Sequence, residues 1–492
     1  MMLLLWLAAI WLAGFGFVRW MFPQPLRWSL HNVFLFSLGI GAGAGIASCL
    51  YFLTLVLAGV RFSVLPAAIG VALVIALALF LLARKSALLD WAEGPAVPRY
   101  LTALFILAAA LALIMFLGAV GYNPHGEEGA WSIWNLKARF LFRAGAFWRD
   151  AFSSDLGWTH PDYPLLLPGL VALCWKLAGQ ESTNAPVAIA FLFLLGTTGV
   201  LVSALGVLRG KNAALLAGTM LLGTASFVAL SAALYGDVPL SFYILATLAL
   251  LCLQDRHPED MRFTALAGLM AGFAAWSRNE GIIFLLAVMV ARAIALIRFG
   301  EGKLLAPQFL RLLLGLAAPL GLVIFFKLRI GGLGDWMAVP ASTILNHLSE
   351  PARWIVMLEG LVIILFNFGR FLIPIFLALG LYWYLVRFRT LVGTGLVGTG
   401  MDARDRAGLA TAGIALALTL AVQLVVDVLY VDNLGLEIGT SFERIMLQLW
   451  PGALLAFFLA SAPLQLIAPK PLEKGTKEKR AHKGARRVAE TR

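Results

Sequence analysis

The sequence predicts an all-α fold, a polytopic transmembrane bundle of about 13 spans with interfacial helices in an outer loop. The first reason is composition: 61% of the 492 residues are hydrophobic and only 13% are charged. A soluble domain is about half apolar and a quarter charged. One folded core could not keep water from so much apolar surface, whereas a bilayer provides a hydrocarbon solvent for it. The second reason is the high content of glycine and aromatic residues, which are typical of membrane helices and membrane interfaces.

Thirteen stretches of the chain come close to the roughly 20 apolar residues that a helix needs to cross a bilayer. Several of them are short, and their ends are defined only to within a few residues. The predicted spans are residues 2–22, 33–57, 63–84, 100–120, 186–208, 212–234, 239–254, 264–277, 280–297, 309–327, 370–386, 407–430 and 444–463.

The basic residues predict the orientation, because cytoplasmic loops carry an excess of Lys and Arg. The loop 387–406 and the tail 469–492 are both basic, so we expect both in the cytoplasm, and the two spans between them agree with this. Counting backward along the chain places four further basic loops on the same side. The net charge of +12 is concentrated in the tail, which we expect to lie near anionic lipid rather than to bind nucleic acid.

This orientation places every unusual polar motif of the chain on the opposite, outer face. Random placement would not favour one face in this way. The outer segments are residues 121–182, 235–239, 277–281, 330–350 and 431–443.

Glu127 and Glu128 come soon after the span 100–120 and open the first outer segment. An acidic pair at a membrane surface can supply a general base, a pair of metal ligands or simply part of a solvated loop. The pair alone does not decide among these three functions.

The next residues, 131–149, predict an amphipathic helix that lies in the plane of the lipid headgroups. Lys137 and Arg139 lie between the apolar positions of this helix. It either anchors the segment at the interface or presents a cationic surface to an anionic lipid headgroup, and the two functions are compatible. The apolar positions recur every three or four residues and are Trp131, Trp134, Ala138, Leu141 and Trp148.

Three prolines between residues 160 and 168 forbid a regular helix there. We therefore expect His160, Asp162 and Tyr163 on a fixed, extended loop. A lone histidine is usually structural, but a cluster of these three side chains on a rigid outer loop suggests a binding site.

Charged residues also occupy the later outer turns. Asp237 precedes a predicted helix start and fits an N-cap position. Arg278 and Glu280 interrupt an apolar run, where charges are costly unless they are paired or solvated. Arg444 begins the last span on the outer side, against the positive-inside trend, so we expect it to face an anionic group.

In this order the motifs resemble those of the GT-C superfamily of membrane glycosyltransferases, especially the bacterial branch similar to protein O-mannosyltransferases and aminoarabinose transferases. In that family an outer loop with an essential acidic residue is followed by an interfacial helix, a proline-rich motif and two polar turns. The resemblance covers residues 100–330 and depends on the order and the shared face, because no single motif is specific. The counterparts here are Glu127 or Glu128, the helix 131–149, the loop 160–168 and the turns 235–239 and 277–281.

The resemblance implies a division of the chain into four parts. Residues 1–98 are expected to form an N-terminal transmembrane extension, and residues 99–330 a GT-C-like catalytic core with the outer loop 121–182. Residues 331–468 are expected to form a C-terminal transmembrane region, followed by the cytoplasmic tail.

The resemblance also implies an enzyme of the inner (plasma) membrane that transfers a hexose or pentose from a polyprenyl-phosphate donor. The acceptor is a lipid, glycan or protein on the extracytoplasmic face. Glu128 or Glu127 is expected to act as the base, with Lys137, Arg139, Arg278 and Arg444 near the phosphate. The residues expected to shape the sugar or acceptor site are His160, Asp162, Tyr163, Asp237 and Glu280.

Two other classes of function fit a polytopic membrane protein. A transporter or flippase of lipid-linked saccharides would have charges near the bilayer centre and paired repeats of broken helices, neither of which the sequence indicates. A polysaccharide polymerase or ligase would favour a large outer loop late in the chain, whereas the largest loop here comes early. No cofactor is indicated, and a divalent metal ion stays compatible with the acidic residues.

Overall fold

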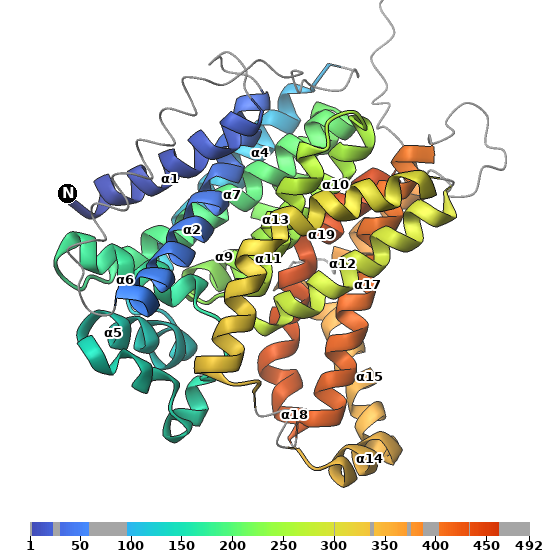
Figure 1. Cartoon of the computed structure of the whole chain (residues 1–492). Helices are drawn as coiled ribbons and strands as arrows, with labels where there is room; N and C mark the ends of the chain where they lie inside the picture. The colour runs from blue at the N-terminus through green and yellow to red at the C-terminus, as the bar shows by residue number, and fades with distance from the viewer. Residues whose placement is uncertain are drawn as a thin grey trace, which may run out of the picture.

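The computed structural model describes residues 2–22, 30–58, 96–299, 301–334, 339–370, 375–386, 403–431 and 433–461. Within these ranges the secondary structure is helical throughout and contains no strand (Figure 1). Ten of the described helices are long and apolar enough to cross a membrane, and α8 with α9 meets the same test as a bent pair. The predicted all-α fold is therefore confirmed for the described residues, and the number of long apolar helices indicates a multi-pass membrane protein.

Shorter helices lie between some of the ten long helices along the described chain. The long helices are α1 (Met2–Met21), α2 (Leu30–Ala58), α4 (Arg99–Tyr122), α7 (Asn184–Arg209), α10 (Asp237–Arg256), α12 (Asn279–Arg298), α13 (Leu305–Phe326), α15 (Pro351–Asn367), α17 (Ala403–Tyr430) and α19 (Glu443–Ala460). The shorter helices are α5 (Asn135–Arg143), α6 (Leu166–Ala178), α8 (Lys211–Leu222), α9 (Ala225–Ala232), α11 (Arg262–Ser277), α14 (Ala341–Ser349), α16 (Ile375–Val386) and α18 (Leu434–Glu437).

Helix α10 lies at the centre of the bundle. Every residue from Asp237 to Asp255 is buried, as expected for a helix that is apolar on all sides. It packs against α7, α11, α17 and α19 (Figure 1). Asp237, its first residue, is therefore held in the interior at one end of the bundle.

The observed helices differ from the predicted spans in several places. The predicted spans 264–277 and 370–386 correspond to the shorter helices α11 and α16. No span is predicted for residues 351–367, which form α15. The predicted span 212–234 is divided into α8 and α9, which are bent by 61°, because Thr224 between them has an extended backbone. The predicted span 63–84, most of the loop 387–406 and the basic tail 469–492 lie outside the described residues.

The predicted interfacial helix 131–149 is also divided. It consists of the π-helical turn η1 (Ala130–Trp134), then α5, then the 3₁₀ segment η2 (Gly145–Phe152). Gly145 has a φ of +56°, which ends α5. The loop after residue 160 is irregular as predicted, but Pro168 lies in the first turn of α6, where proline is tolerated.

The segments with unusual polar residues converge at one end of the bundle. Helices α14 and α18 lie at this end, at the bottom of Figure 1, and α5 lies to the left. We call it the α18 end. Four segments meet beside it: the start of α10, the turn between α11 and α12, the end of α17 and the start of α19. These segments contact one another and line one cavity.

Candidate functional site

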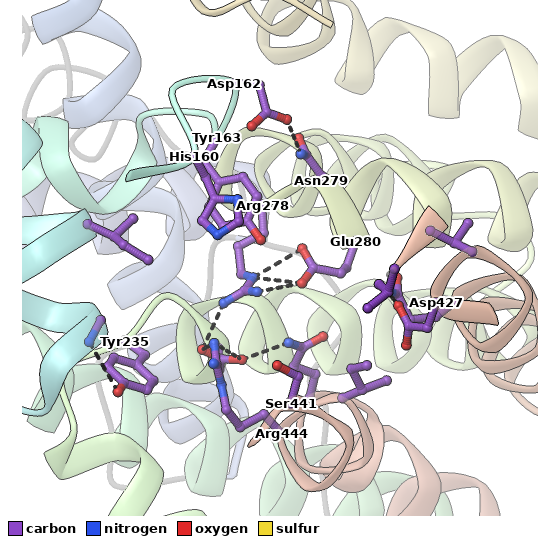
Figure 2. Close-up of a pocket in the computed structure, with 18 of the residues that line it drawn as sticks. His160, Asp162, Tyr163, Tyr235, Arg278, Asn279, Glu280, Asp427, Ser441 and Arg444 are labelled. Carbon is purple, nitrogen blue, oxygen red and sulfur yellow. Dashed lines mark hydrogen bonds and ion pairs between the residues drawn. The ribbon is translucent and has the colours of Figure 1, made fainter. Parts of the chain in front are cut away.

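A cavity of about 260 Å³ lies at the α18 end (Figure 2). Six segments that are far apart in the sequence line it, beginning with η1 and the loop 160–163. The turn before α10 and the turn between α11 and α12 form a second side, and the end of α17 and the start of α19 form a third. The cavity therefore depends on how segments spread between residues 129 and 448 pack together.

An ion cluster around Asp237 forms one side of this cavity. The Asp237 side chain is fully buried, and its Oδ2 accepts hydrogen bonds from Arg278 Nη1 at 2.8 Å and from Arg444 Nη2 at 3.1 Å. Its Oδ1 accepts a third from Gln448 Nε2 at 2.7 Å. As the first residue of α10, Asp237 also lies at the positive end of the helix dipole. Charge and hydrogen bonding together stabilise a buried carboxylate here.

Arg278 joins the α11–α12 turn to this cluster. Its Nε donates to Glu280 at 3.1 Å while Nη1 bonds Asp237. The guanidinium also lies over the rings of Trp134, at 5.6 Å, and Tyr163, at 5.3 Å. Burial lowers the pKa of Arg278, but the two carboxylates more than offset this and raise the pKa well above its ordinary value. Arg278 is therefore a permanent cation that is already held by two carboxylates.

Arg444 is the second arginine of the cavity, and its guanidinium is less fully bonded. It lies over the ring of Tyr235 at 4.7 Å and bonds Asp237 on one edge. Its Nε is buried and has no hydrogen-bond partner among the described residues. A buried N–H without a partner is costly, so this group is suited to donate to an anionic ligand.

Aromatic rings form the opposite side of the cavity. His160 stacks on Tyr163 with ring centroids 4.7 Å apart, and Tyr163 packs against Trp134 at 5.6 Å. His160 adopts the left-handed backbone region, with a φ of +51°. Burial lowers the pKa of His160 and raises the pKa of Tyr163, so burial favours the neutral form of both rings.

A polar network fixes the loop that carries these rings. Asp162 Oδ2 accepts from Asn279 Nδ2 and from Lys327 Nζ, the latter at 3.2 Å, and Lys327 also donates to Asn279 Oδ1 at 2.7 Å. Lys137 Nζ donates to the backbone oxygen of His160. Burial lowers the pKa of Lys137 to about 7, although the nearby Asp162 opposes the shift. These hydrogen bonds thus connect the loop to α5, to the α11–α12 turn and to the end of α13.

Most of the residues predicted for the substrate site come together in this cavity. Lys137 is 1% exposed and supports the loop from behind rather than lining the cavity. Arg139 lies elsewhere, 3.7 Å from Glu181. The predicted residues that line the cavity are His160, Asp162, Tyr163, Asp237, Arg278, Glu280 and Arg444.

The predicted bases, Glu127 and Glu128, lie outside the cavity lining. Both are exposed, and they precede Gly129, which lines the cavity and donates its N–H to the Tyr235 hydroxyl at 3.3 Å. No hydrogen bond or ion pair of either glutamate side chain occurs within the described part of the chain. The pair therefore lies at the rim, with its carboxylates open to solvent.

Apart from Arg444, sequence reasoning missed the wall that α17 and α19 contribute. Gln423, Asp427 and Tyr430 come from the last two turns of α17, and Gln448 from α19. Gln423 Nε2 donates to Asp427 Oδ1 at 3.0 Å. Polar residues at the outer end of the predicted span 407–430 were the available signal, but nothing in the sequence places them opposite Arg278, as Figure 2 shows for Asp427.

A second hollow, of about 690 Å³, lies beside the cavity. It is formed by the end of α15, by Phe368–Arg370 and by the π-helical segment η8 (Ile438–Phe442). Ile363 and Phe366 line it and are 61% and 60% exposed. Glu443 lines this groove, whereas Arg444, the next residue, lines the cavity. Consecutive residues at the start of α19 therefore face the groove and the charged cavity.

Among the described residues no group of three or more His, Cys, Asp or Glu side chains could hold a metal ion. The three cysteines are buried and free. Comparison of the chain with protein-family models, with curated proteins and with solved structures finds no match. The function must therefore be argued from the geometry of the cavity.

Proposed function

We propose that this chain is an integral membrane glycosyltransferase. It transfers a sugar from a polyprenyl-phosphate donor to a lipid, glycan or protein acceptor on the extracytoplasmic face of the inner (plasma) membrane. The observation that carries the proposal is the cavity at the α18 end, where two arginines lie beside aromatic rings and amide groups. These groups match the phosphate and the sugar of such a donor, and the surrounding apolar helices match its lipid.

The phosphate is assigned to the two arginines. Arg444 offers its Nε, which has no hydrogen-bond partner among the described residues. Arg278 and Arg444 both form an ion pair with the Asp237 carboxylate. Guanidinium groups bind phosphate through parallel hydrogen bonds, which strengthen as negative charge develops on the leaving phosphate. This arrangement resembles the phosphate site expected from the sequence, except that Lys137 and Arg139 do not contribute to it directly.

The sugar is assigned to the space between the rings and α17. The apolar faces of a sugar pack on aromatic rings such as those of Trp134 and Tyr163, while its hydroxyls bond side chains such as Gln423 and Gln448. The volume of about 260 Å³ is below the range of about 300–1,000 Å³ typical of sites for drug-sized ligands. We therefore assign a single sugar unit to the cavity.

The base is assigned to the glutamate pair at the rim. The oxygens of Asp237, Glu280 and Asp162 already accept hydrogen bonds from basic or amide groups, whereas those of Glu127 and Glu128 are open to solvent. In the transfer, one of these carboxylates takes the proton of the acceptor hydroxyl. The hydroxyl oxygen bonds to the anomeric carbon, and the bond from that carbon to the phosphate oxygen breaks. Polyprenyl phosphate leaves with the electron pair.

The polyprenyl chain is assigned to the groove beside α15. Its apolar residues, such as Ile363 and Phe366, face outward from the bundle, where lipid would meet them. Arg444 lies one residue from the groove-lining Glu443. A donor whose chain occupies the groove can therefore place its phosphate at the cavity.

The direct test uses membrane vesicles that contain the purified chain and radiolabelled polyprenyl-phosphate sugars. We expect transfer of label to an extracted acceptor fraction and release of polyprenyl phosphate, both lost in the Arg444→Ala variant. The Arg329→Gln variant is the control, because Arg329 is an exposed arginine outside the cavity. A parallel assay with a chelator tests whether a divalent ion assists. Absence of transfer by the folded wild-type chain with any such donor would refute the proposal.

A further inference from the structure

The carboxyl end of α17 is bonded by side chains from α14 and α15. The last carbonyl groups of a helix have no partner within the helix. Here Arg353 Nε donates to the Val428 oxygen at 2.9 Å, and Arg353 Nη2 donates to the oxygen of Val431. His347 Nδ1 bonds the Leu429 oxygen at 2.8 Å. Basic side chains at this position also interact favourably with the helix dipole.

The same turn of α17 forms a wall of the cavity. Asp427, Tyr430 and Val431 line it. The bonded carbonyls of Val428 and Leu429 thus lie between Asp427 and Tyr430, and Val431 both lines the cavity and has its carbonyl bonded. A shift of this turn by a fraction of its pitch would move Asp427 away from Glu280 and Arg278, which lie across from it (Figure 2).

Helix α14 makes few other packing contacts. None of its residues is buried, and Leu345 and Leu348 are 63% and 51% exposed. Its main packing partner is α17, and Trp354 Nε1 ties its end to α15 through the Leu348 oxygen at 3.1 Å. The bonds to the carbonyls of α17 thus join a peripheral helix pair to the cavity wall.

We propose that Arg353 and His347 form a clamp that positions the last turn of α17, and with it Asp427 and Tyr430, in the wall of the cavity. Both are positioning residues, since neither lines the cavity. Arg353 is the main member, because its planar guanidinium reaches two carbonyls while a lysine ammonium is a single point of charge. The structural part of this proposal is independent of the proposed function, and its effect on catalysis rests on that function.

Hydrogen exchange of the full-length protein in lipid nanodiscs tests the clamp. We expect backbone amides in residues 424–431 to exchange about tenfold faster in Arg353→Gln, the scale of losing one or two hydrogen bonds. Arg353→Lys should give an intermediate rate, and Arg329→Gln should match the wild type. Equal exchange of this segment in Arg353→Gln and the wild type would overturn the clamp.

Kinetics test whether the clamp acts through the cavity wall. With the donor that supports transfer, Arg353→Gln should raise KM several-fold more than it lowers kcat, and its effect should be less than additive with that of Asp427→Asn. Additive effects would show that Arg353 does not act through Asp427 and would overturn the positioning role. If the wild-type chain transfers no sugar, the proposed function fails, while the exchange result still decides the clamp.

Discussion

Arg278 Nη1 donates a hydrogen bond of 2.8 Å to Asp237 Oδ2, and both side chains are almost completely buried. The two residues are 41 positions apart in the sequence. Asp237 begins α10, and Arg278 has an extended backbone between α11 and α12. Their bond therefore joins the start of α10 to the α11–α12 turn. Because α10 is the central helix, this ion pair links the core of the bundle to the cavity.

The first prediction concerns the stability that Asp237 provides. Replacing Asp237 with Asn leaves Arg278 and Arg444 without their shared negative charge. Removing one partner of a buried ion pair typically costs about 3–5 kcal/mol, so we expect a strongly lowered melting temperature in detergent. Asp260→Asn is the control, since its pair with Arg262 is partly exposed and such pairs contribute little. Similar melting temperatures for the two variants would contradict this prediction.

The second prediction separates the two arginines. Arg278→Lys should lower the melting temperature, because one ammonium cannot replace a guanidinium that bonds both Asp237 and Glu280. Arg444→Lys should keep most of the stability but raise the apparent KM for the polyprenyl-phosphate sugar about tenfold, since it loses the Nε donor. Thermal melting and donor titration of both purified variants provide the measurement. The reverse pattern would make Arg278, rather than Arg444, the main ligand of the phosphate.

The third prediction concerns the glutamates at the rim. Glu127→Gln and Glu128→Gln keep the side-chain size and remove the charge. One of the two should reduce turnover by about a hundredfold or more, the usual scale for loss of a general base. The assay is sugar transfer at saturating donor, with expression and melting temperature as controls. Full activity in both variants would exclude the two glutamates as the base and would leave Asp427, on the far wall of the cavity, as the candidate.

The sequence predicts much of this arrangement because two patterns are local. Apolar runs define most of the helices, and polar residues at their ends define one face. His160, Tyr163, Asp237 and Arg278 are found from these patterns alone, and they meet in one cavity.

What the sequence does not show depends on distant partners. No span is predicted for residues 351–367, although α15 is long and apolar enough to cross a membrane. Arg353 and Glu359 are the two charged residues in this run. The structure explains Arg353 by carbonyl groups 75 and 78 residues away. Lys327 ends a predicted span without any local partner, but bonds Asp162, 165 residues earlier. Such pairs become visible only when the helices are packed.

The fourth prediction concerns the orientation of the chain. A single cysteine at position 155, which is exposed in the structure, should react with an impermeant maleimide added outside intact cells. A single cysteine at position 480 should react only after the membrane is opened, as the positive-inside rule requires. Cys49, Cys174 and Cys252 are buried, so the native thiols should give little background. Labelling of both positions from the same side would reject the proposed orientation.

The fifth prediction concerns Lys137 and pH. Burial lowers the pKa of this lysine to about 7 in the folded protein, whereas an unfolded lysine has a pKa of about 10.4. Between these values the unfolded chain binds a proton that the folded protein has released, so the free energy of unfolding rises with pH. Below about pH 7 both states are protonated, and the cost of burying the charge is fully present. The melting temperature should therefore increase as the pH is raised from 7 to 9.

Replacing Lys137 with Met tests this origin, because the apolar side chain fills the buried space without a charge to bury. The increase in melting temperature between pH 7 and pH 9 should be smaller in Lys137→Met than in the wild type. Lys303→Met is the matched control, since Lys303 is exposed and its replacement should leave the pH dependence as it is. His160 does not interfere, because burial lowers its pKa below the usual value of about 6.5, outside this window. An unchanged slope in Lys137→Met would show that the ammonium stays protonated through this range, held by Asp162 and the His160 carbonyl.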